Sequence, residues 1–117
     1  MSGFKSDQYG TCTLTVKRAC PIELTMHIIG GKWKCIILSL LSQSPMYYNA
    51  MRREIPGITQ RILTLQLRDL EKDGIIEREE TNENPKKVLY YLTALGGDLV
   101  PILESIKTWG NAYMRKQ

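Results

Sequence analysis

Apolar residues recur at every third or fourth position over most of this 117-residue chain, a spacing that is typical of amphipathic helices. This periodicity predicts helices over residues 21–29, 32–41, 46–54, 59–73 and 94–115. Two short runs rich in Ile, Val and Tyr, at 75–80 and 87–92, are separated by a polar turn and predict a β-hairpin. We therefore expect a mainly α fold with one small β-hairpin.

The apolar face of each predicted element indicates which side chains form the core. Alternate residues of the second hairpin run share one face of the strand. The expected core positions are Trp33, Ile36, Ile37, Leu40 and Leu41; Tyr48, Met51 and Ile55; Leu63, Leu67 and Leu70; and Val88, Tyr90 and Leu92. A chain of this length can bury such a core as one domain, but it is too short for a separate catalytic domain.

The breaks between helices are marked by glycine and proline. Residues 55–58, Ile-Pro-Gly-Ile, predict a short turn between the third and fourth helices. Thr59 is a favourable N-cap for the fourth helix, and Gly74 favours its termination. Inside the last helix, the ring of Pro101 clashes with the carbonyl of Gly97, so we expect a kink there rather than a break.

Two helices joined by a short turn and followed by a hairpin are the outline of a winged helix-turn-helix, here with a three-helix core plus a wing. We predict a single winged helix-turn-helix domain over residues 1–117, with residues 1–12 as a mobile arm. The N-terminal helix and the helix at 94–115 are extra elements, to which we assign dimerisation.

The fourth helix carries polar side chains on the face opposite its leucines, and such a face suits the major groove of double-stranded DNA. The predicted reading residues are Gln60, Arg61, Thr64 and Arg68. Glutamine suits adenine and arginine suits guanine, while the backbone N–H groups that follow Thr59 could hold a phosphate. The alternative is a solvated helix face that binds nothing.

Basic residues beside this helix are candidates for contacts with DNA phosphates rather than with bases. They are Arg52 and Arg53 at the end of the third helix, and Lys86 and Lys87 at the hairpin tip, 82–87. The alternative for such a residue is to compensate the charge of a helix end. The first hairpin arm is crowded with acidic residues, which are Glu77, Glu79, Glu80 and Glu83. We therefore expect only the tip and the second arm of the hairpin to touch DNA.

The last helix has an apolar stripe that is long for a chain of this size to cover. The stripe contains Leu99, Ile102, Leu103, Ile106, Trp109 and Tyr113. A second copy of the helix would cover it and give a two-fold homodimer, with two reading helices about one DNA turn, roughly 34 Å, apart. The alternative is that the stripe folds back on Trp33 and the N-terminal helix of its own chain, and a mixture of the two is also open.

Composition narrows the class of protein further. The net charge of +4 favours a polyanionic partner without identifying it. No apolar run approaches the roughly 20 residues that a membrane span needs, and the first seven residues lack a signal-peptide core, so we expect a cytoplasmic protein without a membrane partner. The chain contains no P-loop, nucleophile elbow or dinucleotide motif, and we predict neither an enzyme nor a cofactor.

The chain has an odd number of cysteines, Cys12, Cys20 and Cys35, which argues against a structural disulfide framework. Cys20 begins a predicted helix and follows two cations, and both features favour the thiolate, so Cys20 is the candidate redox-sensing residue. The alternative is a small apolar residue packed at a dimer interface. A metal site formed with His27 is not expected, because no two cysteines have the C-x-x-C spacing.

Several segments together resemble the HxlR-type transcriptional regulators, in the same order and spacing over about 90 residues. They are Cys20-Pro21-Ile22, Ile29 to Trp33, Arg52 to Ile58, Leu63 to Gly74, and Tyr91 to Trp109. The resemblance implies a winged helix-turn-helix dimer that binds operator DNA, and a cysteine at position 20 that senses electrophiles or oxidants in several members. Tyr47 and Ala50 depart from the basic and acidic residues that are usual there.

The hypothesis from the sequence is therefore a homodimeric, sequence-specific transcriptional regulator that responds to a small reactive inducer through Cys20. Two other classes remain as alternatives. A winged helix that serves only as a protein-interaction module would not need Arg61 and Arg68 for DNA affinity. A small thiol-dependent enzyme would need a resolving partner close to Cys20.

Overall fold

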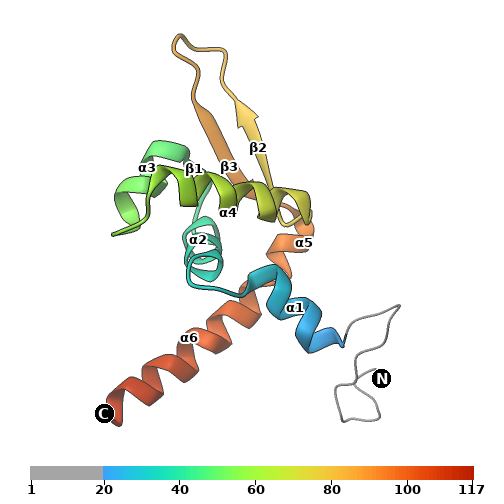
Figure 1. Ribbon diagram of the computed structural model, residues 1–117, viewed down its shortest axis with the longest axis vertical. Coiled ribbons are helices and arrows are strands. Elements are labelled where there is room, and N and C mark those ends of the chain that lie inside the picture. The colour runs from blue at the N-terminus through green and yellow to red at the C-terminus, as the bar shows by residue number, and fades with distance from the viewer. Residues whose placement is uncertain (1–19) are drawn as a thin grey trace. The chain divides into compact units, whose positions relative to one another are not determined.

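The computed structural model describes residues 20–117 (Figure 1), and the predicted arm at 1–12 lies outside the described residues. The chain forms two compact units, one ending at Lys32 and the other running from Trp33 to Gln117. The single-domain assignment stays a prediction. In the first unit, α1 (Pro21–Ile29) begins with proline in its first turn, where the missing N–H costs nothing.

The second unit contains five helices and a three-stranded antiparallel sheet with the strand order β1-β3-β2. Its elements are α2 (Lys34–Leu41), β1 (Met46–Tyr47), α3 (Tyr48–Glu54), α4 (Gln60–Lys72), β2 (Ile76–Glu80), β3 (Val88–Leu92), α5 (Ala94–Gly97) and α6 (Val100–Arg115). Figure 1 shows the β2–β3 hairpin projecting beyond α3 and α4. This arrangement is a winged helix-turn-helix, and it confirms the predicted fold class.

The predicted helix at 46–54 is wrong at its start, because Met46 and Tyr47 form β1 and the helix begins at Tyr48. The two residues pair with Tyr90 and Leu89 of β3. An exposed strand edge has unpaired backbone groups, and these two residues bond to that edge of β3. The sheet therefore ties the start of α3 to the wing.

The core of the second unit lies between α2, α3, α4 and the base of the wing. Its buried side chains include Ile37, Leu38, Leu41, Met51, Ile55, Leu63, Leu67, Leu70, Ile75, Ile76 and Tyr90. The predicted face of α2 is partly wrong, because Ile36 is 43% exposed while Leu38 is fully buried. Helix α2 contacts both α6 and β3, so its buried face is set by contacts between elements and not by helical periodicity alone.

The expected kink near Pro101 is also wrong, because the chain breaks into α5 and α6. The N–H of Leu99 bonds to the carbonyl of Gly96 at 3.0 Å in the intervening turn. Pro101 then lies in the first turn of α6, where no helical hydrogen bond is lost. Starting a new helix avoids the clash that continuing the first one would cause.

Candidate nucleic-acid interface

The outer face of α4 is a polar surface on a rigid helix. Gln60, Arg61 and Arg68 are exposed, and Thr64 is half-buried. With Leu65 they line one shallow hollow on the surface. Within residues 20–117, no hydrogen bond or ion pair engages the guanidinium groups of Arg61 and Arg68. The structure thus brings the four predicted reading residues together, with both arginines available to a ligand.

Both ends of α4 are fixed by local sequence. The Thr59 side chain accepts a hydrogen bond from the N–H of Ile62 at 3.1 Å, which confirms it as the N-cap. At the other end, Gly74 adopts a φ of 77°, and the N–H of Ile75 bonds to the carbonyl of Leu70 at 2.9 Å. This is a Schellman motif, which needs a residue that tolerates positive φ. The outer face of α4, which carries Gln60, Arg61, Thr64 and Arg68 and is called the reading face below, therefore has a defined start and length.

Tyr48 fixes α4 against α3. Its hydroxyl donates a hydrogen bond to the backbone carbonyl of Gln60 at 3.1 Å and shares a second one with the Thr64 hydroxyl at 3.0 Å. The sequence placed Tyr48 on the inward face of α3 but gave no sign of this contact. Tyr48 is thus a positioning residue that sequence reasoning missed, and it occupies the hydroxyl of a predicted reading residue.

The acidic residues of α4 are held away from its reading face. Asp69 pairs with Lys34 of α2 at 3.6 Å, and Glu71 pairs with Arg78 of β2 at 3.5 Å. These two cations partly neutralise the carboxylates on the flanks of the helix. The positive charge of the reading face is consequently not cancelled by its own helix.

Two more cations extend the positive surface along α3. Arg52 and Arg53 are exposed in the last turn of this helix, as predicted, and with Asn49 they line a hollow on the surface. Neither guanidinium has an ion-pair partner in the described part of the chain. Their position fits both a contact with a DNA phosphate and compensation of the partial negative charge at the C-terminal end of α3.

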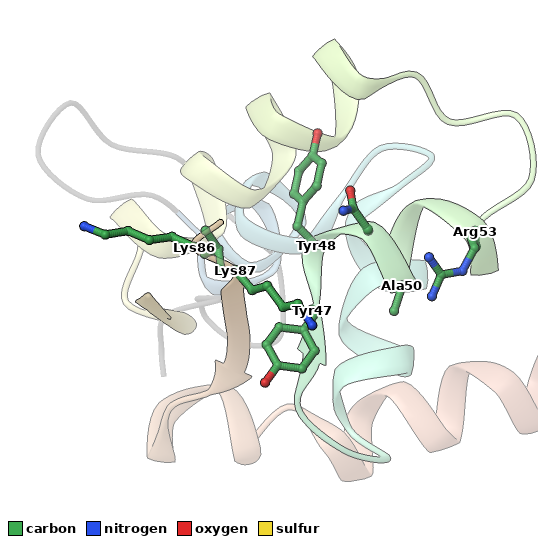
Figure 2. A pocket seen from close by; sticks show the side chains of 8 residues that line it. Tyr47, Tyr48, Ala50, Arg53, Lys86 and Lys87 are labelled. Carbon is green, nitrogen blue, oxygen red and sulfur yellow. The ribbon is translucent and has the colours of Figure 1, made fainter. Parts of the chain in front are cut away.

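A cleft of about 460 Å³ separates the start of α3 from the wing. Figure 2 shows Tyr47, Tyr48 and Arg53 on the β1–α3 side, and Lys87 reaching across toward Tyr47. The ammonium group of Lys87 lies 5.6 Å from the centre of the Tyr47 ring. The cleft therefore has cationic groups at both edges and aromatic rings along its wall.

The wing-tip lysines lie where the sequence placed them, but each has an acidic neighbour. Lys86 pairs with Glu80 at 4.0 Å and Lys87 pairs with Glu83 at 3.7 Å. Both lysines are exposed, and such surface pairs contribute only about 0–1 kcal/mol. A phosphate can replace these carboxylates at small cost.

The apolar stripe of α6 is only partly used inside the chain. Leu103 is buried and Leu99 is half-buried, and α6 contacts α2. Further along, Trp109 is 68% exposed and stacks on the ring of Tyr113, with the ring centres 5.3 Å apart. The remaining exposed members of the stripe are Ile102, Ile106 and Tyr113. Within the second unit, the first turns of α6 therefore pack against their own chain through α2, while its later turns leave an apolar face exposed.

The two described cysteines differ from each other. Cys20 is fully buried and disulfide-bonded, so the expectation of a free thiolate at this position is wrong in this structure. Cys12 lies outside the described residues. Cys35 is a half-buried thiol, and burial raises its pKa. Over residues 20–117 the structure contains no group of three or more His, Cys, Asp or Glu side chains that could hold a metal ion.

In the described part of the chain, no single helix is long and apolar enough to cross a membrane. Only α1 and α2 taken together, as a bent pair, reach the length and apolar composition of a membrane span.

The fold and the cationic face of α4 define a winged helix-turn-helix of the nucleic-acid-binding class. The model of the HxlR-like helix-turn-helix family matches residues 28–117, and the chain belongs to this family. The HTH-type transcriptional regulator YdeP of Bacillus subtilis strain 168 is 50% identical over 94 residues, which are 80% of this chain and 73% of that protein.

Two solved structures are similar over most of their length. The structure of the redox regulator HypR in its oxidized form has 48% identity and a TM-score of 0.76, and the match covers 80% of this chain and 96% of that chain. The structure of the HTH-type transcriptional regulator ytcD has 41% identity and a TM-score of 0.78, covering 81% and 97%. The predicted resemblance to HxlR-type regulators is therefore confirmed.

Proposed function

We propose that this chain is a cytoplasmic homodimer that regulates transcription by binding operator DNA, and that it acts by binding rather than by catalysis. The observation that carries the proposal is the outer face of α4, where Arg61 and Arg68 are exposed with no ion pair to any described residue. A helix with this face fits the major groove, and arginine forms bidentate hydrogen bonds with guanine.

Each predicted site residue has a role in this proposal. Arg61 and Arg68 read guanine, and Gln60 reads adenine. Thr64 lies on the same face, but its hydroxyl is bonded to Tyr48, which leaves its methyl group for base contact. The Thr59 side chain occupies the N–H of Ile62, and the preceding N–H groups of Gln60 and Arg61 are left for a phosphate.

The phosphate contacts come from both sides of the reading helix. Arg52 and Arg53 contact the backbone beside the end of α3, and Lys86 and Lys87 contact it from the wing tip. The cleft between α3 and the wing has a cation at each edge, which supports placing a strand of the DNA backbone along it.

The two copies associate through α6. The exposed stack of Trp109 and Tyr113, together with Ile102 and Ile106, forms an apolar face that another α6 would cover. Leu99 and Leu103, which already pack in their own chain, form the base of this interface. A two-fold axis there makes the two α4 helices read an inverted repeat.

Selection of bound sequences from random duplex DNA tests the function. We expect an inverted repeat with half-sites about 34–36 Å apart, centre to centre. Trp109→Glu should place a charge in the apolar face, weaken the dimer and select single half-sites, whereas Lys107→Glu on the same exposed helix is the control. Absence of any enriched sequence would overturn the proposal and favour a protein-interaction module.

Cys20 makes the regulator responsive to oxidants in this proposal. Two thiols lose two electrons and two protons to an oxidant when a disulfide forms, and Cys20 is disulfide-bonded in the structure. The redox regulator HypR is a similar protein of known structure, and so is the transcriptional regulator YodB from B. subtilis. The change at Cys20 alters the geometry of the dimer and thus the spacing of the reading helices.

A gel-shift assay with the selected DNA tests the role of Cys20. Diamide should change the affinity of the wild-type protein, and Cys20→Ser should abolish this response while leaving binding under reducing conditions intact. Cys35→Ser is the matched control, because Cys35 is a half-buried thiol with a raised pKa and should react slowly. An equal diamide response in the Cys20→Ser protein would remove Cys20 from the mechanism.

A further inference from the structure

Leu65 is an apolar residue on a face that is otherwise polar and cationic. It is 46% exposed, and it lines the hollow on the outer side of α4 with Arg61 and Arg68. The other leucines of this helix, Leu63, Leu67 and Leu70, are buried on the opposite side. A single exposed leucine is common on protein surfaces, so its place on the reading face, and not its exposure, needs a physical account.

The spacing along α4 puts Leu65 between the two arginines. It follows Arg61 by four residues and precedes Arg68 by three, so all three side chains lie along one stripe of the helix. At about 1.5 Å per residue, Leu65 is displaced from them by roughly 6 and 4.5 Å along the helix axis. Because base pairs are about 3.4 Å apart, these displacements correspond to one or two base steps.

We propose that Leu65 recognises the C5-methyl group of a thymine that lies within about two base pairs of the arginine-bound guanines. Among the base edges in the major groove, thymine alone offers a methyl group, and apolar side chains contact it. An exposed leucine would lose water-accessible apolar area against that methyl group, whereas cytosine at the same position offers an amino group that leucine cannot bond. The proposal rests on the proposed function, since it requires α4 in the major groove.

Removal of single methyl groups from the DNA tests the proposal. Thymine in the selected site is replaced, one symmetry-related pair at a time, by uracil, which keeps all hydrogen-bonding groups and lacks only the methyl. We expect one such replacement to weaken wild-type binding about fourfold per half-site, the factor that corresponds to burying one methyl group at ~0.8 kcal/mol. For both half-sites the factor is about 15.

The Leu65→Ala variant supplies the other half of the test. It should bind the thymine and uracil sites equally at the sensitive position, while its thermal stability stays unchanged because Leu65 is exposed on a helix and alanine is a good helix former. Leu95→Ala is the matched control, since Leu95 is also exposed but lies on α5. This control should keep the full wild-type sensitivity.

The outcomes separate this proposal from the proposed function. If the wild-type protein selects a sequence but no thymine position is sensitive, or if Leu65→Ala keeps the same sensitivity, Leu65 does not read the methyl group although the regulator reads DNA. If the protein selects no sequence at all, the proposed function and the role of Leu65 fall together.

Discussion

Replacing both Arg61 and Arg68 with alanine should reduce affinity for the selected DNA about a thousandfold or more, down to the level of random DNA. Each bidentate contact between arginine and guanine contributes about 1–3 kcal/mol of discrimination, and the dimer would make four such contacts. Specific and non-specific binding differ by about 4–10 kcal/mol in typical regulators, and this range limits the loss. The two side chains are exposed and have no ion pair with a described residue, so folding should be unaffected.

The measurement is a titration of selected and random DNA at one fixed salt concentration, because affinity for DNA falls steeply with salt. Arg115→Ala at the end of α6 is the control and should bind as the wild type does. Arg52→Ala should instead weaken binding to both DNAs equally and reduce the salt dependence. An unchanged ratio between the two DNAs in the double variant would exclude α4 as the reading element.

The reading helix itself was predictable from sequence because its determinants are local. Its three inward leucines recur at helical spacing, its start is set by the capping side chain of Thr59, and its end is set by Gly74. Each of these signals acts within a few residues of where it occurs. The residues on the exposed face of α4 could therefore be predicted from the leucine spacing and the two helix ends.

The features that sequence reasoning missed depend on contacts between distant residues. Strand β1 is two residues long and exists because β3 offers a free edge more than 40 residues later in the chain, a pairing that no local pattern reveals. The bond between the Tyr48 and Thr64 hydroxyls likewise requires a particular packing of α3 against α4. Similarly, the positions of Lys86 and Lys87 were predictable, whereas their glutamate partners depend on how the hairpin turn closes.

The break between α5 and α6 shows how close two local interpretations can be. The same residues, Gly97 and Pro101, predict a weak point in the helix, and both a kink and a break would relieve the clash. Tertiary packing decides between them, because Gly96 is buried against Ile75, just after the end of α4. The position of α5 is thus fixed by the base of the wing and not by continuity with α6.

That packing makes Gly96→Ala strongly destabilising. A Cβ atom at Gly96 would be placed against the carbonyl oxygen of Ile75, far inside van der Waals contact, and the obstacle is backbone that cannot rotate away. The side chain of Thr93 donates a hydrogen bond to the carbonyl of Gly74 at 2.7 Å and caps the N–H of Gly96 at 3.0 Å. Moving α5 outward to admit the methyl group would break these bonds, so we expect a loss of about 3 kcal/mol.

Thermal unfolding measures this loss, and a domain of this size should lose roughly 12 °C or more in Tm. Gly97→Ala is a sharp control, because it adds the same methyl group one residue away, where no atom lies within 4 Å, and should leave Tm equal or slightly higher. Equal Tm values for the two variants would mean that α5 is not packed against Ile75. Thr93 and Gly96 hold the junction of α4 and β2. Gly96→Ala should therefore also loosen the wing relative to the reading helix, and weaken DNA binding at temperatures where the variant remains folded.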